Sequence, residues 1–455
     1  MPEETLKNLK ETNEGRKVKM RKCLKTKSGI TLIALVVTIV VLLILAGVSI
    51  SLLLDENGII KKSKDARREY GQAKANEQED LSNLSDMIEE ATGKVTLAKV
   101  PVGTKASKNG TINGEEGNSN NPTIPKNYIP IDTATSTWGD GSTAPSQDSV
   151  NHGLVIKDDK NNEWVWVPVP DVTVMCDTSN TTEYTLCGTT GDTAVKTKLY
   201  SKSGIISGKT RITPGTSSNY REPDLVVGSD GAKYDAKDTY YKTILGDTGT
   251  KEQLAQLFVE DYKEMIESIQ KYGGFYIGRY ELSDAGVQKE KQPLTKTNWY
   301  NLYKKCTELN ASEKVETRMI WGCQWDVTMN WLISSGAKTS DEVNKDSSSW
   351  GNYYASSVKA DDGTTEIKAS GDVQVLNTGK TTFTMANNIY DLAGNCSEWT
   401  QEANGTSVRA VRGGSYVSRG SGSPASDRIY SSPDSYAGIR FSSHFNNKVI
   451  LDTRA

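Results

Sequence analysis

The most pronounced pattern in the chain is a charge-free apolar run over residues 30–54, ITLIALVVTIVVLLILAGVSISLLL. At about 1.5 Å per helical residue, a run of this length matches a bilayer core of about 30 Å. Lysine and arginine crowd residues 1–29, and such a basic flank holds an N-terminus in the cytoplasm. The pattern predicts a single-pass protein of the cell membrane, with a transmembrane helix, its N-terminus inside and its C-terminal domain extracellular.

After this run the chain turns polar, but apolar residues over 55–93 keep a spacing of three and four, from Ala66 to Ala91. This spacing predicts an amphipathic helical stalk, and a solvated helical spacer without a partner is the alternative. Residues 94–150 are rich in Gly, Ser, Thr and Asn. Because they hold little apolar surface, we expect a linker with short strands.

Strand and helix patterns alternate without βαβ regularity from residue 151 onward. Two β-rich runs, 153–156 and 163–169, flank the turn-prone DDKNN and predict a hairpin. Helical patterns cover residues 251–272 and the region around 320–332. The prediction is an α+β domain over 151–445 with much irregular loop, followed by a C-terminal tail at 446–455.

The composition of the chain argues against several classes of function. The net charge is −3 and no basic patch occurs beyond the N-terminus, so the sequence predicts no surface that binds nucleic acid. Only two histidines occur, so imidazole-based hydrolysis has few candidates. Six widely spaced cysteines include no CxxC pair, but Cys176 and Cys187 flank a predicted hairpin and can form a disulfide; Cys323 and Cys396 have core-like neighbours.

The start of the apolar run, KSGITL at residues 27–32, resembles the prepilin-type cleavage and methylation segment of type IV pilins. The resemblance implies that prepilin peptidase cuts between Gly29 and Ile30 and that the new N-terminus is methylated. An uncleaved anchor is the alternative, and the run is too long for a secretory signal. Many pilins carry glutamate where this chain has Ala34, which favours a minor, tip or membrane-retained subunit over a major pilin.

Four spaced motifs between residues 151 and 445 resemble the sulfatase-modifying-factor family, which includes the formylglycine-generating enzyme. They are GGFYIGRYE at 273–281, WGCQWD at 321–326, NNIYDLAGNCSEW at 387–399, and AVRGGSY at 410–416 with AGIRF at 437–441. The resemblance implies a fold related to C-type lectins. Copper-dependent members carry two cysteines where this chain has Ser418 and Ser423, and hydroxyls do not replace thiolates on copper. No copper and no enzyme activity are therefore expected, with a divergent enzyme as the alternative.

The same resemblance implies a structural calcium ion in the loop at 390–399. Carried over to this chain, Asp391 and Glu398 would give carboxylate oxygens, and Gly394 and Cys396 backbone carbonyls. Hard oxygen donors suit Ca²⁺. The alternative is that Glu398 forms an ion pair or caps a turn.

The segment between Arg412 and Arg440 is dense in Tyr, Ser, Asp, Gly and Arg, a composition that resembles antibody paratopes. Variable receptors of diversity-generating retroelements have their randomised residues in such a segment, and an ordinary irregular surface is the alternative. The candidate ligand-binding residues are Tyr416, Ser418, Arg419, Ser421, Ser423, Asp427, Arg428, Tyr430, Asp434 and Tyr436.

These patterns together predict a pilin-like, surface-displayed adhesion protein of a bacterium, which binds a surface, host or phage ligand without catalysis. Its other expected partners are prepilin peptidase, the membrane and other pilin-like subunits. The alternative function is a minor pseudopilin or tip subunit of a type IV pilus or a type II secretion-like machine, located in the pilus or pseudopilus.

Overall fold

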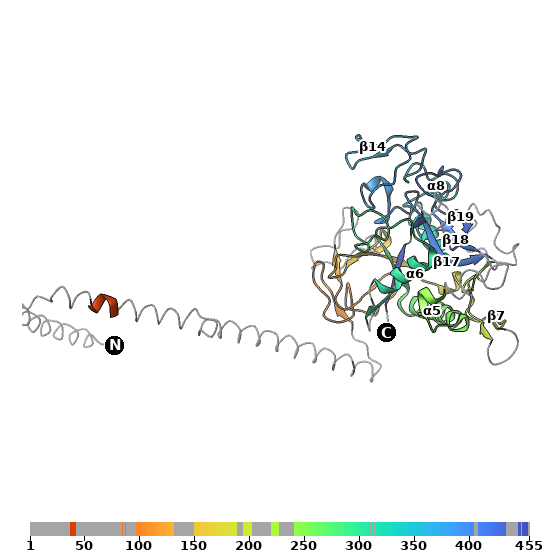
Figure 1. The fold of residues 1–455 in the computed structure, drawn as a ribbon, viewed down its shortest axis with the longest axis horizontal. Coiled ribbons are helices and arrows are strands. Elements are labelled where there is room, and N and C mark those ends of the chain that lie inside the picture. Colours follow the sequence, from red (N-terminus) through yellow and green to blue (C-terminus); the bar gives the residue numbers. More distant parts are fainter. Residues whose placement is uncertain are drawn as a thin grey trace, which may run out of the picture. The chain divides into compact units, whose positions relative to one another are not determined.

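The computed structural model divides the chain into two compact units, residues 1–85 and 86–455 (Figure 1). It describes residues 37–41, Leu84, Met87, 97–131, 150–188, 194–202, 220–226, 241–309, 311–312, 315–404, 408–433, 445–446 and 448–453.

The first unit bears on the membrane prediction. Among the residues that the structure describes, no helix combines the length and the apolar character needed to cross a bilayer. This finding corrects the predicted transmembrane helix and the single-pass membrane location. Of the predicted span at 30–54 only 37–41, a helical turn with exposed apolar side chains, is described. The processing site at Gly29 and Ile30, and the predicted stalk apart from Leu84 and Met87, lie outside the described residues.

A seven-stranded sheet forms the centre of the second unit. Each strand runs antiparallel to its neighbours. In spatial order the strands are β11 (Ala311–Ser312), β12 (Val315–Met319), β21 (Val449–Thr453), β10 (Gly274–Gly278), β6 (Glu163–Pro168), β5 (Val155–Lys157) and β4 (Ile129–Ile131).

Both faces of this sheet are covered, which explains why its central strands β6 and β10 are mostly apolar. On β6, Trp164 and Trp166 belong to one hydrophobic cluster, while Val165 and Val167 belong to the other. Successive side chains of a strand point to opposite faces, so a run such as WVWV supplies two cores at once. The predicted hairpin at 153–169 is confirmed as β5 paired with β6.

The long helix α5 (Lys251–Tyr272) packs along the sheet and has the bounds that the sequence predicts. Thr250 and Gln253 form a capping box at its start, and Gly273, at φ 77°, ends it in the left-handed conformation. The second predicted helix is confirmed as α7 (Gly322–Ser334). The other helices are α4 (Tyr241–Leu245), α6 (Trp299–Glu308), α8 (Ser340–Asn344) and the short 3-10 turns η2 (Val172–Val174) and η4 (Thr382–Thr384).

A second sheet has the order β19-β18-β17-β20, and β9 pairs with β17 outside this path. Its strands are β9 (Tyr220–Arg221), β17 (Ser397–Asn404), β18 (Val408–Arg412), β19 (Arg428–Ser431) and β20 (Phe445–Asn446). Small sheets are formed by β1 (Ala98–Lys99), β2 (Gly110–Thr111) and β3 (Thr123–Ile124); β7 (Tyr184–Cys187) and β8 (Val195–Thr197); β13 (Val358–Lys359) and β14 (Glu366–Lys368); and β15 (Met385–Ala386) and β16 (Ile389–Tyr390).

The described residues are therefore mostly sheet with few helices, which corrects the predicted α+β class with an N-terminal helical stalk and an irregular lectin-like domain. Two segments predicted as peripheral also belong to the core. Residues 97–131 of the expected linker bury Val100, Ile112, Ile124 and Tyr128. The expected C-terminal tail supplies β21, which lies between β10 and β12.

Replacing Ile277 tests this core. Its side chain is fully buried on β10, opposite Ile450 and Val165. We expect Ile277→Ala to lower the free energy of unfolding by about 2–5 kcal/mol, because the cavity cannot fully collapse between two packed strands. Urea unfolding followed by tryptophan fluorescence measures this change. The exposed Val174→Ala serves as a control with an expected change within about 0.5 kcal/mol, and equal losses in both variants would contradict the assignment.

Candidate functional site

The segment predicted to bind a ligand connects two strands of the second sheet. Strand β18 pairs with β17 on one side and with β19 on the other. Figure 1 labels these three strands side by side in blue. Residues 413–427 run from the end of β18 to the start of β19, so both ends of the segment are held by the sheet.

Two glycines let the segment leave the sheet. Gly413 and Gly414 have φ angles of 81° and 71°, a conformation that other residues rarely adopt. A Cβ on Gly413 would lie 2.5 Å from Glu398 Oε2, and one on Gly414 would lie 2.4 Å from the Ser423 carbonyl oxygen. The close passage of the backbone therefore requires glycine at both positions.

A buried ion cluster holds the two ends of the segment together. It consists of Asp326 on α7, Glu402 on β17, Arg412 at the end of β18 and Arg428 at the start of β19. Arg428 donates to Asp326 Oδ2 at 2.6 Å and pairs with Glu402 at 2.8 Å, and Arg412 pairs with the same two carboxylates. All four side chains are at most 1% exposed, and their formal charges cancel. We call these four residues the ion cluster.

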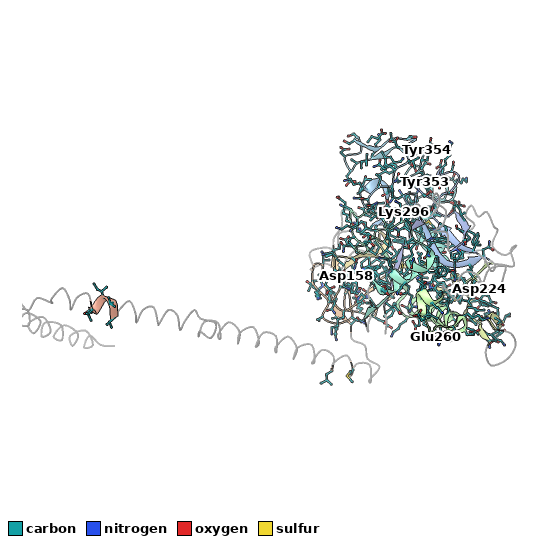
Figure 2. The ribbon with its side chains drawn as sticks, in the orientation of Figure 1. Asp158, Asp224, Glu260, Lys296, Tyr353 and Tyr354 are labelled. Carbon is teal, nitrogen blue, oxygen red and sulfur yellow. The ribbon has the colours of Figure 1, made fainter. Side chains whose placement is uncertain are left out.

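Two consecutive tyrosines connect the segment to the interior and to the surface. Tyr353 is buried and donates its hydroxyl to the Gly413 carbonyl oxygen at 2.7 Å; burial raises the pKa of this phenol well above its usual value. Tyr354 is half-buried, its backbone N–H donates to Ser418 O at 2.9 Å, and the Arg419 guanidinium lies 5.9 Å from its ring centroid. Figure 2 labels both residues at the end of the unit that also carries β14 and α8 in Figure 1.

The structure divides the predicted ligand-binding residues into three groups. Ser423, Asp427 and Arg428 are buried, so their side chains do not line the surface. Tyr416, Ser418 and Tyr430 are half-buried; the Tyr430 hydroxyl donates to Glu402 of the ion cluster at 2.7 Å. Arg419 and Ser421 are exposed, while Asp434 and Tyr436 lie outside the described residues.

A second loop lies beside the exposed side chains at this end. Gly371 donates its N–H to Tyr354 O at 2.7 Å, which brings the loop at 369–374 beside Tyr354 and the 415–422 segment. Val373 is 60% exposed and Val417 is 39% exposed. We call this surface the tyrosine–arginine platform; it consists of Tyr354, Val373, Tyr416, Val417, Ser418, Arg419 and Ser421.

Sequence reasoning missed Tyr354 and Val373, although both contribute to the platform. Both stand well before the predicted segment, which starts at Arg412, and no local pattern connects them to it. Their placement depends on two backbone hydrogen bonds, from Tyr354 N to Ser418 O and from Gly371 N to Tyr354 O. The sequence feature that could have indicated Tyr354 is the adjacent pair Tyr353-Tyr354, which stands in a stretch rich in Gly and Ser.

The predicted calcium ligands lie in a second buried cluster of charges. Asp391 and Glu398 are at most 2% exposed, as are Glu281 on the loop after β10 and Lys448. Burial raises the pKa values of Glu281 and Glu398 well above their usual range and lowers the pKa of Lys448. Glu281 accepts from Cys396 N at 2.9 Å and from the Asn395 amide at 2.5 Å.

Glu398 is the side chain of this cluster that fits a bound cation. Both of its carboxylate oxygens are buried without a hydrogen-bond partner, and such a group is costly unless a proton or a cation compensates it. Asp391 Oδ2 already accepts from Thr378 Oγ1 at 2.8 Å and from Gly379 N at 3.1 Å. Among the described residues no group of three or more His, Cys, Asp and Glu is arranged to hold a metal ion.

If a calcium ion binds here, Glu398 would supply its carboxylate, and the resemblance implies Asp391 and the carbonyl oxygens of Gly394 and Cys396 as the further donors. The charges of the cluster agree with this role. Three carboxylates and one ammonium leave two negative charges uncompensated, and either two protons or one divalent cation makes the cluster neutral.

The cysteines of the described part are buried, and Cys176 and Cys187 are free thiols. The expected disulfide between Cys176 and Cys187 is not formed, and the two residues belong to different hydrophobic clusters. Burial raises the pKa of Cys176 to about 11, and the pKa values of Cys323 and Cys396 lie well above the usual value for the same reason. Cys323 and Cys396 are fully buried, as their core-like neighbours predicted.

Comparisons with known proteins identify no family for this chain. No family model matches the chain, and no curated protein matches it. Among solved structures, the chain is similar to Treponema denticola variable protein 1, with 15% sequence identity over 40% of this chain and 85% of that protein, at a TM-score of 0.25. A likeness of this size supports no conclusion on fold or function.

Removing one arginine tests the ion cluster. We expect Arg412→Met to lower the free energy of unfolding by about 3–5 kcal/mol, because Asp326 and Glu402 would then share one buried cation instead of two. Lys345→Met is the matched control, since its ion pair with Asp341 is more than two thirds exposed and should contribute less than about 1 kcal/mol. Chemical unfolding of both variants provides the measurement, and equal stabilities would rule out the role assigned to the cluster.

Thermal unfolding of the full chain with excess Ca²⁺ and with a chelator tests the calcium site. If Glu398 holds a calcium ion, Ca²⁺ should raise the melting temperature, because a ligand that binds only the folded state stabilises it. The effect should vanish in Glu398→Gln. Identical melting curves for the unsubstituted protein in both buffers would show that protons compensate the cluster instead.

Proposed function

We propose that the second unit is a non-catalytic binding domain that presents the tyrosine–arginine platform to a protein ligand. The observation that carries this proposal is the contrast within one segment: Arg412, Asp427 and Arg428 are buried, whereas Val417, Arg419 and Ser421 are exposed. Such a segment has a fixed base and an exposed outer surface.

The chemistry of the platform supports a protein as the ligand. Tyrosine and arginine are enriched at the energetically important positions of protein interfaces, because each offers a large contact area together with hydrogen-bond donors. Arg419 stacked near Tyr354 presents a planar cation beside an aromatic ring. Val373 and Val417 add exposed apolar area, and Ser418 and Ser421 add hydroxyl groups that adapt to a partner.

The support beneath the platform favours binding by a preformed surface. Tyr354 N donates to Ser418 O, Tyr353 donates to Gly413 O, and the ion cluster holds the strand ends on either side. A surface that is ordered before binding loses less conformational entropy when it meets a partner. This arrangement supports recognition without requiring any reactive group.

The proposal includes the absence of catalysis. It is supported by the type of side chain at the positions where copper would bind. The positions that would carry copper-binding cysteines in the enzymes that the motifs resemble are Ser418 and Ser423. Hydroxyl groups are poor ligands for copper(I). Ser423 is also 5% exposed, so its hydroxyl is not offered to a substrate.

Selection against a displayed peptide library tests the binding function. The full chain is immobilised and probed with phage displaying random dodecapeptides, and retained clones are measured against variants. We expect Tyr354→Ala and Arg419→Ala each to weaken binding about tenfold or more, the loss typical of a central interface residue.

Lys263→Ala is the matched control, because Lys263 is an exposed cation on α5. It should leave binding unchanged, and circular dichroism should show all three variants folded. The proposal fails if no clones are enriched over an unrelated protein, or if the retained clones bind the two platform variants as well as the control.

A further inference from the structure

The backbone beneath the exposed side chain of Arg419 is held in place. The Arg419 carbonyl oxygen accepts from Ser423 N at 2.8 Å, which closes a turn in the segment. A Cβ on the next residue, Gly420, would lie 2.5 Å from Ser348 N and 2.8 Å from Asp346 Oδ1. The backbone at this point therefore packs closely against the loop that follows α8, and the arginine side chain starts from a fixed position.

The guanidinium group of Arg419 lies over the ring of Tyr354. The distance from its central carbon, Cζ, to the ring centroid is 5.9 Å, and Tyr354 N donates to Ser418 O at 2.9 Å. A guanidinium group carries five N–H donors in one plane. A cation–π contact uses the charge of this group and none of its donors as hydrogen bonds. The contact with the ring therefore leaves the donors of Arg419 for a further partner.

Other arginines of the described part contact carboxylates of the chain itself. Arg279 pairs with Glu163 at 2.7 Å, Arg318 pairs with Asp261 at 2.6 Å, and the two arginines of the ion cluster share its two carboxylates. Among the described residues, by contrast, no carboxylate forms an ion pair with Arg419. Arg419 is thus a positioned and exposed cation that lacks the partner which these other arginines have.

Two acidic side chains on the loops beside the platform interact with other groups. Asp346 Oδ1 accepts from Ser348 N at 2.9 Å. Burial lowers the pKa of the Lys368 ammonium group, and the negative charge of Asp372 counteracts this shift, so Asp372 acts on a buried cation. Neither acid neutralises Arg419 through an ion pair. A negative group of a ligand would therefore find the Arg419 donors unoccupied by these acids.

We propose that Arg419 binds a carboxylate of the ligand, so that the platform selects protein segments in which an aspartate or glutamate side chain lies beside an apolar one. This inference rests on the proposed binding function. A guanidinium group and a carboxylate match in shape and form two parallel N–H···O bonds. Val417 and Val373 offer exposed apolar area for the neighbouring side chain of the ligand.

An acidic side chain fits this arrangement better than two other anions do. A phosphate group carries nearly two negative charges and is generally bound by a cluster of arginines, whereas the platform as defined contains one. A free C-terminal carboxylate is generally captured by a nest of backbone N–H groups. The N–H groups that follow Arg419, those of Gly422 and Ser423, donate to the Arg419 carbonyl oxygen, each at 2.8 Å.

Sequencing the phage clones that the immobilised full chain retains is the first part of the test. The random dodecapeptides are joined to the coat protein through their C-terminal ends, so no peptide offers a free C-terminal carboxylate. We expect the retained peptides to be enriched, relative to the unselected library, in aspartate or glutamate next to an apolar residue.

The second part measures how the acid and Arg419 depend on each other. A synthetic peptide from a retained clone is compared with the same peptide in which the acidic residue is replaced by its amide, and binding is followed by fluorescence anisotropy. The amide peptide should bind the unsubstituted protein about tenfold or more weakly, because a charge-assisted pair is lost. Arg419→Met should bind both peptides with equal affinity, since it has no guanidinium group to distinguish them.

Two further variants define the controls. Arg419→Lys keeps the charge without the paired donors, so it should show a smaller difference between the two peptides than the unsubstituted protein does. Lys263→Ala changes an exposed cation on α5 and should keep the full tenfold difference. Circular dichroism of each variant confirms that it is folded.

The outcomes separate this inference from the proposed function. If no clones are enriched over an unrelated protein, the binding function itself fails, and the role of Arg419 fails with it. If clones are enriched but carry no excess of acidic residues, binding stands and the carboxylate inference is overturned. It is also overturned if the acid and amide peptides bind the unsubstituted protein equally, or if their difference persists in Arg419→Met.

Discussion

The neutral ion cluster is the interaction on which the candidate binding surface depends. Asp326, Glu402, Arg412 and Arg428 come from one helix and three strands, and each arginine contacts both carboxylates. Removing these charges from water is costly, and the cost is offset only when every charge keeps its partners. The helix and the strands must therefore sit in one arrangement, which fixes where the 413–427 segment begins and where it ends.

The cluster works together with packing that the apolar residues provide. Arg412 lies 6.0 Å from the ring centroid of Trp325, whose indole N–H donates to Ala425 O at 3.0 Å within the same segment. Tyr353 adds the bond to Gly413. The ends of the 413–427 segment thus contact both aromatic and charged side chains. The aromatic rings restrict where the arginines can lie, and the ion pairs restrict where the rings can lie.

The sequence predicted local elements better than their place in the fold. The bounds of α5 and the β5–β6 hairpin follow from apolar spacing, a capping residue and a turn, all of which lie within a few residues. Strand β21 was expected to be a tail, because its central position depends on pairing with β10 and β12, far away in the chain. The apolar run at 30–54 is a further case in which the local pattern was not sufficient. Its composition predicted a membrane span, but no helix among the described residues is long and apolar enough to cross a bilayer.

The candidate site was located from composition, but its buried and exposed members could not be separated in that way. Serine, tyrosine, aspartate and arginine serve equally in a binding surface and in a buried network. Arg428 and Arg419 differ because Asp326 and Glu402, distant in sequence, meet only the former. Substitutions at Val417, Arg419 or Ser421 remove no interaction of the ion cluster, so these positions can change at little cost in stability. Under the proposed binding function, the chemistry of the exposed surface can therefore change while the ion cluster that supports it stays the same.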